Sequence, residues 1–148
     1  MTIQEIQEEI INEFKYLDQW EDKYSYLIKL GKTLSPMDSE YLKKDYLVKD
    51  CQLTTWLHST FEEGRVFYEI DSTSVIIKGA ANLLIRILSG RKPEDIINAD
   101  LYFIDKTGLR ESCAPGRIGD LLKLIDKMKR DANPYVYKTE AVERKQIM

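Results

Sequence analysis

The chain has 148 residues, 43% of them hydrophobic, and its 25 acidic and 22 basic side chains give a formal net charge of −3. This length suits one domain with its own core, and no basic block is present that would follow the phosphates of a nucleic acid. No apolar run approaches the ~20 residues of a membrane span, and residues 1–5 lack the features of a secretory signal, so we expect a cytoplasmic protein without a membrane partner.

Apolar periodicity predicts two helices at the start of the chain. Residues 3–17 form one apolar stripe, because their large hydrophobic side chains fall three or four positions apart. Asp18 and Glu21 resemble a capping box, which predicts a second helix that ends at Gly31 and forms a hairpin with the first. Residues 34–49 have no clear period and are interpreted as an ordered connector.

Two alternating segments follow. Residues 51–59 and 65–71 both alternate between apolar and polar side chains, and Glu62-Glu63-Gly64 lies between them. This pattern predicts an antiparallel β-hairpin with Leu53 and Leu57 on one face.

The second half of the chain reads as helical. Residues 75–88 predict a largely apolar, central helix, Pro93 opens a short one, and residues 101–109 make a further turn or two. After a loop at residues 113–117, a last amphipathic helix is expected. The fold class predicted is α+β, with a small antiparallel sheet packed against several helices. The domain would span residues 1–132, with residues 133–148 as a tail that is in part disordered.

Motifs of catalysis and cofactor binding are scarce. The two cysteines, Cys51 and Cys113, form no CxxC pattern, which predicts neither a disulfide framework nor a metal site. The single histidine, His58, would point to the opposite face of a regular strand from Cys51, which disfavours a Cys–His dyad. No phosphate-binding or hydrolase motif occurs, and we expect no cofactor.

Cys51 is the candidate reactive residue. It lies where a loop enters the first predicted strand, so that the sheet could anchor its backbone while a partner reaches its sulfur. Lys49 and Arg117 are candidate positive neighbours that would favour the thiolate. A free cysteine is more often simply buried, and this interpretation applies to Cys113. Trp20 and Trp56 are both predicted to lie in the core.

Four stretches, in order, resemble the SufE family of sulfur-acceptor proteins. Val48–Leu57 is similar to the family motif V-x-G-C-x-x-x-V-W, and Trp20–Gly31 to W-E-x-K-Y-x-x-L-I-x-L-G. Asp71–Gly79 is similar to D-S-x-x-x-I-x-x-G, and Pro115–Leu121 to P-S-R-x-x-G-L. The resemblance extends to about Met128.

The resemblance implies that this chain is not an enzyme. A SufS-type cysteine desulfurase, which uses pyridoxal phosphate, would pass a persulfide sulfur to Cys51 and be stimulated by the contact. The chain would then pass the sulfur to an iron–sulfur cluster scaffold. Supporting or partner-binding roles fall to four residues near this cysteine or in the matching loop: Lys49, Asp50, Gln52 and Arg117.

The chain departs from the family pattern at both of the motif glycines near the site. Asp50 replaces the glycine before the cysteine, and its negative charge should raise the pKa of the thiol unless Lys49 or Arg117 compensates. Asp120 replaces the glycine of the P-S-R-x-x-G-L loop. We also expect the sulfur of Cys51 to retract against an apolar face, beside Leu53 and Leu57, when no partner is docked.

Two other functions are carried as alternatives. One is a pure adaptor that activates a desulfurase while Cys51 is structural. The other is a transferase or hydrolase that depends on Cys51, which the lack of a partner base makes less favourable. The sequence leaves open whether the chain forms a homodimer.

Overall fold

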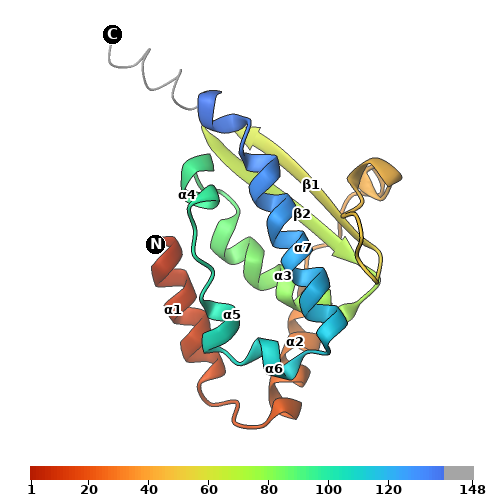
Figure 1. Ribbon diagram of the computed structural model, residues 1–148, viewed down its shortest axis with the longest axis vertical. Helices are drawn as coiled ribbons and strands as arrows, with labels where there is room; N and C mark the ends of the chain where they lie inside the picture. Colours follow the sequence, from red (N-terminus) through yellow and green to blue (C-terminus); the bar gives the residue numbers. More distant parts are fainter. Residues whose placement is uncertain (139–148) are drawn as a thin grey trace.

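The computed structural model describes residues 1–138, and the part of the predicted tail at residues 139–148 lies outside the described residues. In chain order the elements are α1 (Ile3–Phe14), α2 (Trp20–Thr33), the 3₁₀ turns η1 (Ser39–Tyr41) and η2 (Lys44–Tyr46), β1 (Thr55–Glu62), β2 (Arg65–Ser72), α3 (Val75–Leu88), α4 (Pro93–Ile97), α5 (Phe103–Lys106), α6 (Leu109–Ser112) and α7 (Pro115–Ala132). Figure 1 shows the helices gathered on one side of a long β-hairpin. The α+β fold class is confirmed.

The predicted antiparallel hairpin is confirmed. β1 and β2 pair antiparallel from Thr55 with Ser72 to Glu62 with Arg65. The two residues that connect them, Glu63 and Gly64, have positive φ angles of 52° and 80°. Two successive left-handed residues suit a tight hairpin turn because their twist matches that of the strands.

Helix α3 is the centre of the core. Nine of its residues are buried, and Ser74 caps its first turn by accepting a hydrogen bond from the N–H of Ile77 at 3.2 Å. Helix α2 approaches α3 so closely that a Cβ on Gly79 would lie 2.1 Å from the carbonyl oxygen of Leu27. A glycine is therefore required there by the backbone contact between the two helices.

Helix α7 lies across the hairpin (Figure 1). The Tyr68 hydroxyl donates to the carbonyl oxygen of Met128 at 2.7 Å, and the Ser59 hydroxyl donates to Asp131 at 2.9 Å. These bonds tie the C-terminal half of α7 to both strands. Its N-terminal half reaches the segment that precedes β1.

Several predicted boundaries were wrong. The strand expected from residue 51 begins at Thr55, and Leu53 is 37% exposed. The expected loop at residues 113–117 is shorter, because α7 already begins at Pro115. The residue that caps α2 is Gln19, without a side-chain bond, so Asp18 does not form the predicted capping box. Trp20 is 60% exposed and does not lie in the core.

No helix in the described part of the chain is both long enough and apolar enough to cross a membrane.

Candidate functional site

Cys51 lies on a short loop, Asp50–Leu53, which we call the cysteine loop. The loop starts directly after a fixed point, because the N–H of Val48 donates to the carbonyl oxygen of Thr55 at 2.8 Å. Asp50 adopts a left-handed backbone with φ of 67°, which turns the chain just before the cysteine. Aspartate tolerates this conformation better than most residues do. The side chain of Cys51 is half-buried against the core.

A buried carboxylate on α7 holds the backbone of the cysteine loop. Asp120 is 1% exposed, and its oxygens Oδ1 and Oδ2 accept from the N–H groups of Gln52 at 2.7 Å and Leu53 at 3.0 Å. Hydrogen bonds to a charged acceptor contribute roughly 1.5–3 kcal/mol each, about twice as much as neutral ones. The loop is therefore attached to the helix by its main chain, although it belongs to neither a helix nor a strand.

Two cations on the same helix complete the attachment. Arg117 donates from Nη2 to the side-chain oxygen of Gln52 at 3.2 Å, and its Nη1 lies 3.5 Å from Asp120. Lys123 donates from Nζ to the carbonyl oxygen of Asp50. Residues 117, 120 and 123 are three apart and share one face of α7. This face meets the loop along its whole length.

The surroundings of Cys51 favour the protonated thiol. Burial is the main cause that raises its pKa, and the charges of Asp120 and Asp50 raise it further, while Lys123 lowers it. The sulfur also lies 3.8 Å from the carbonyl oxygen of Asp120, to which the S–H donates. A partner that removes this bond or adds positive charge would increase the thiolate fraction.

The structure brings together most, but not all, of the residues singled out in the sequence. Asp50, Gln52 and Arg117 lie around Cys51, whereas Lys49 is exposed next to the loop. Neither Lys49 nor Arg117 is among the charges that shift the thiol pKa. The cation that lowers this pKa is Lys123, so the expected compensators were wrong.

Asp120 and Lys123 are the residues that sequence reasoning missed. Asp120 was visible as a departure from the family loop, but its role required knowing that Pro115–Gly119 is helical, which places residue 120 on the face toward the cysteine. An acid three residues after an arginine was the available signal. Lys123 carried no signal, because it is one of many charged residues on an amphipathic helix.

The other candidates lie apart from this chemistry. His58 stacks on Tyr41 with ring centroids 3.5 Å apart, and its Nδ1 faces Glu69 at 3.4 Å. Cys113 is half-buried against the core, and burial raises the pKa of its thiol. Within the described residues, no group of histidine, cysteine and acidic side chains could hold a metal ion.

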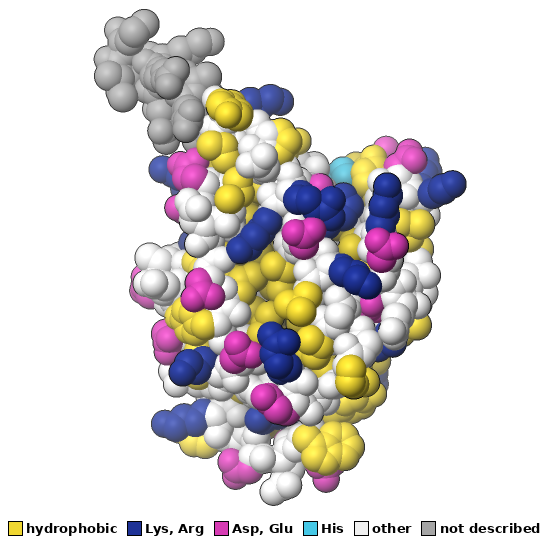
Figure 2. Space-filling view, in the orientation of Figure 1, with side chains coloured by type: hydrophobic (Ala, Val, Ile, Leu, Met, Phe, Trp, Pro, Cys, Tyr) yellow, Lys and Arg dark blue, Asp and Glu magenta, His cyan; other side chains and the backbone are white. Residues whose placement is uncertain are grey.

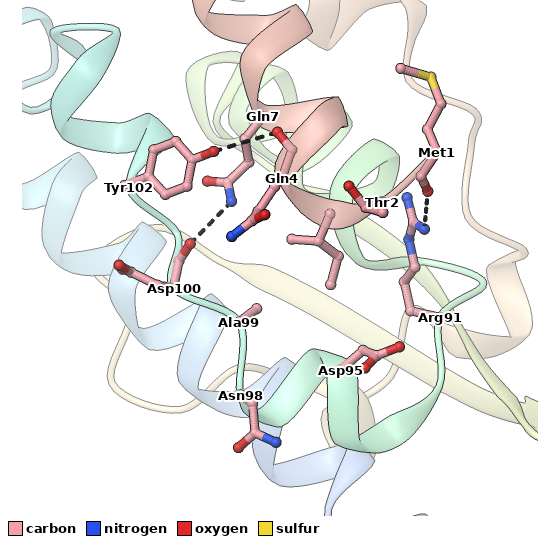
Figure 3. Close-up of a pocket in the computed structure, with 11 residues that line it drawn as sticks. Met1, Thr2, Gln4, Gln7, Arg91, Asp95, Asn98, Ala99, Asp100 and Tyr102 are labelled. Atoms are coloured by element: carbon pink, nitrogen blue, oxygen red, sulfur yellow. Dashed lines mark hydrogen bonds between the residues drawn. The ribbon is translucent and has the colours of Figure 1, made fainter.

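A cavity of about 510 Å³ lies elsewhere, between the start of α1 and the segment around α4 (Figure 3). Hydrogen bonds join its walls: Gln7 donates to the carbonyl oxygen of Asp100 at 3.0 Å, and Arg91 donates to that of Met1. The dashed lines in Figure 3 show that these bonds join residues on opposite sides of the cavity's lining to one another. These bonds fix α1 to the body of the protein.

The visible surface is mixed in charge. Figure 2 shows Lys and Arg side chains interspersed with Asp and Glu around apolar side chains in the middle of the face. No single-sign field covers the described part of this face.

Comparison with known proteins decides the family. Residues 8–132 match the model of the SufE family, described as an Fe-S metabolism associated domain. The chain belongs to the SufE family. It is therefore related to proteins of Fe–S metabolism and cysteine desulfuration.

Two curated relatives illustrate the extent of the similarity. The chloroplastic/mitochondrial SufE-like protein 1 of Arabidopsis thaliana is 36% identical over 126 residues, which cover 84% of this chain but only 34% of the plant protein. The cysteine desulfuration protein SufE of Wigglesworthia glossinidia brevipalpis is 28% identical over 82% of this chain and 86% of its own. The chain thus spans about a third of the first relative and most of the second.

A solved structure shares the fold. The solution structure of a hypothetical protein from Thermus thermophilus superposes with a TM-score of 0.73, covering 89% of this SufE-family chain and 96% of its own. At 21% identity, this likeness concerns the fold alone.

Proposed function

We propose that this chain is a sulfur carrier that accepts persulfide sulfur from a SufS-type cysteine desulfurase on Cys51 and stimulates that enzyme. It then passes the sulfur to an iron–sulfur cluster scaffold. The observation that carries this proposal is a half-buried thiol on a loop that hydrogen bonds attach to α7. Membership of the SufE family supports it.

The transfer is an exchange at sulfur that needs no oxidant. The Cys51 thiolate attacks the outer sulfur of the donor's persulfide, a new S–S bond forms on Cys51, and the donor's own sulfur leaves as a thiolate. In the onward step, a thiolate of the acceptor attacks the outer sulfur of the Cys51 persulfide, and the Cys51 thiolate leaves. The rate depends on the thiolate fraction of the attacking group and on access to its sulfur.

The geometry favours a carrier over a thiol-dependent transferase or hydrolase. A nucleophile that acts alone is activated by a base within hydrogen-bond reach, by a lowered pKa or by a metal ion. Here the thiol of Cys51 donates to a main-chain carbonyl, and His58 is engaged by Tyr41 and Glu69. We therefore propose that the chain works together with a partner enzyme and is not itself an enzyme. We place this activity in the cytoplasm, where thiols stay reduced.

The test is intact-mass measurement after incubation with a cysteine desulfurase and free cysteine. The unmodified chain and Cys113→Ser should gain one sulfur, and Cys51→Ser should gain none. Sulfur retained on Cys51→Ser would overturn the proposal. If Cys51→Ser fails to load but stimulates the desulfurase fully, the chain is an adaptor instead. Turnover of a small thioester without a partner would favour the transferase or hydrolase.

A further inference from the structure

Asp120 is the most buried acidic side chain next to the cysteine, and the sulfur-exchange chemistry gives it no task. Its carboxylate is 1% exposed. Burying a carboxylate is costly unless each oxygen finds partners. Both oxygens do, and the partners are the main-chain N–H groups of the two residues that follow Cys51.

Arg117 is a second possible partner for the carboxylate of Asp120. Nη1 of Arg117 is buried and forms no hydrogen bond within the described part of the chain, although it lies only 3.5 Å from Oδ2 of Asp120. A small movement would turn this ion pair into a direct hydrogen bond. When the N–H of Leu53 leaves, Asp120 therefore need not be left as an unpaired buried charge, and Arg117 gains the bond that it lacks.

These contacts define one arrangement of the loop and provide the partners for a second. In the closed one, Asp120 accepts from Gln52 and Leu53, and the thiol of Cys51 lies against the carbonyl of residue 120. In the open one, Asp120 and Arg117 pair with each other and the loop is free to carry the sulfur outward. Discrete arrangements of this kind allow a partner to shift a population.

We propose that Asp120 is a positioning residue for sulfur transfer, whose carboxylate holds the cysteine loop closed on α7 until a docked partner draws the loop away. This inference rests on the proposed role of Cys51 as sulfur acceptor. Asp120 touches neither sulfur donor nor acceptor. It sets how often the thiol is available and how readily it ionises.

The test compares Asp120→Asn with Asp126→Asn, which removes the same charge from an exposed site on the same helix. An asparagine at position 120 keeps one acceptor oxygen, but its NH₂ group would face an N–H donor of the loop. Alkylation of Cys51 by iodoacetamide is followed across pH. Tryptic peptides separate the two cysteines, because Lys49 and Arg65 bound one peptide and Arg110 and Arg117 the other.

Two features of the pH profile are expected to change in Asp120→Asn. The midpoint should move to lower pH, since a negative charge beside the thiol is removed, and the plateau at high pH should rise several-fold, since an open loop exposes the sulfur. Asp126→Asn should match the unmodified chain in both. A profile that coincides with that of Asp126→Asn, or one that changes only its midpoint, would overturn the positioning role.

A measurement on the unmodified chain covers the case in which Asp120→Asn does not fold. Amide hydrogen exchange by NMR should show the N–H groups of Gln52 and Leu53 protected relative to an unstructured peptide of the same sequence. Exchange at the peptide's rate would mean that the carboxylate does not hold the loop, which defeats the inference.

Sulfur loading separates this inference from the proposed function. With a desulfurase and cysteine, Asp120→Asn should load sulfur on Cys51 faster than Asp126→Asn does. If the unmodified chain itself gains no sulfur, the proposed function fails, and the alkylation profiles still decide whether Asp120 holds the loop.

Discussion

Two aspartates stand where glycines occur in the family motifs, and they affect the cysteine in different ways. Asp50 keeps the left-handed turn that a glycine would make, with φ of 67°, and adds a charge beside the sulfur. Asp120 adds a second charge but also supplies the hydrogen bonds that fix the loop. Both charges raise the pKa of the thiol, so this chain favours a resting, protonated Cys51.

Removing the charge of Asp50 should make Cys51 more reactive. Asp50→Gly is expected to increase the alkylation rate of Cys51 near neutral pH, because one of the charges that raise the thiol pKa is lost. Asp50→Asn is the matched control, because asparagine keeps the tolerance for a left-handed backbone while it also removes the charge. Equal gains in both variants would assign the effect to charge. An unchanged or slower rate in both would contradict it.

The pH dependence of the thiols follows from the same shifts. The pKa values of Cys51 and Cys113 are both raised above the ordinary 9.0, mainly by burial. The folded chain therefore holds these protons at pH values where the unfolded chain has lost them, so the free energy of unfolding should fall as pH rises above about 9. Urea unfolding at several alkaline pH values measures this slope. In Cys113→Ala the decline should be shallower, and an identical decline would argue against the assignment.

At the scale of elements, apolar periodicity was a reliable guide and boundaries were not. The central helix was predicted at residues 75–88 and occupies Val75–Leu88, because its apolar circumference and capping serines leave little choice. The strand was predicted four residues too early, because Leu53 continues the alternation of residues 55 and 57 in the sequence. The carboxylate of Asp120 takes the N–H of Leu53, and only the tertiary fold reveals that competitor.

The close crossing of α2 and α3 should be intolerant of a single methyl group. A Cβ on Gly79 would lie 2.1 Å from the carbonyl oxygen of Leu27, which is backbone and cannot turn aside. Gly79→Ala should lower the free energy of unfolding by about 3 kcal/mol or more, the upper range for overpacking. Denaturant unfolding provides the measurement.

Gly119→Ala on α7 is the control for that substitution. A Cβ there meets nothing within 4 Å, and alanine is favoured over glycine within a helix by roughly 0.5–1 kcal/mol. This variant should therefore be slightly more stable than the unmodified chain. Similar destabilisation of both variants would contradict the α2–α3 contact as the cause of the loss.

For the molecule as a whole, the site is assembled by contacts distant in sequence. The cysteine loop and α7 are about 70 positions apart in the sequence, and Gln52 and Asp120 are one such pair. The two segments meet because α7 is bound to the hairpin through Tyr68 and Ser59. Sequence motifs identified both partners of this contact separately. They could not supply the pairing, since no local pattern encodes which face of a helix a loop will meet.

The complete fold should therefore suppress the reactivity of Cys51, although the residue lies on a loop. Half-burial against the core and the bond to the carbonyl of Asp120 both exist only in the folded chain. At one pH, Cys51 is expected to react with iodoacetamide several-fold more slowly in native protein than in urea. Urea removes the burial and the fixed charges together, so the thiolate fraction and the access rise at once.

The rate for Cys113 provides the internal reference in the same digest. Cys113 is also half-buried, and burial raises the pKa of its thiol, so its rate shows how a partly covered cysteine outside the cysteine loop responds to a stabilising variant such as Gly119→Ala. Cys51 should keep a component of reactivity that does not follow global stability, because opening the loop requires only the release from α7. If the rate for Cys51 falls in step with the unfolded fraction of the chain, Cys51 is reached only in the unfolded chain, and a carrier role would have no structural route to its partner.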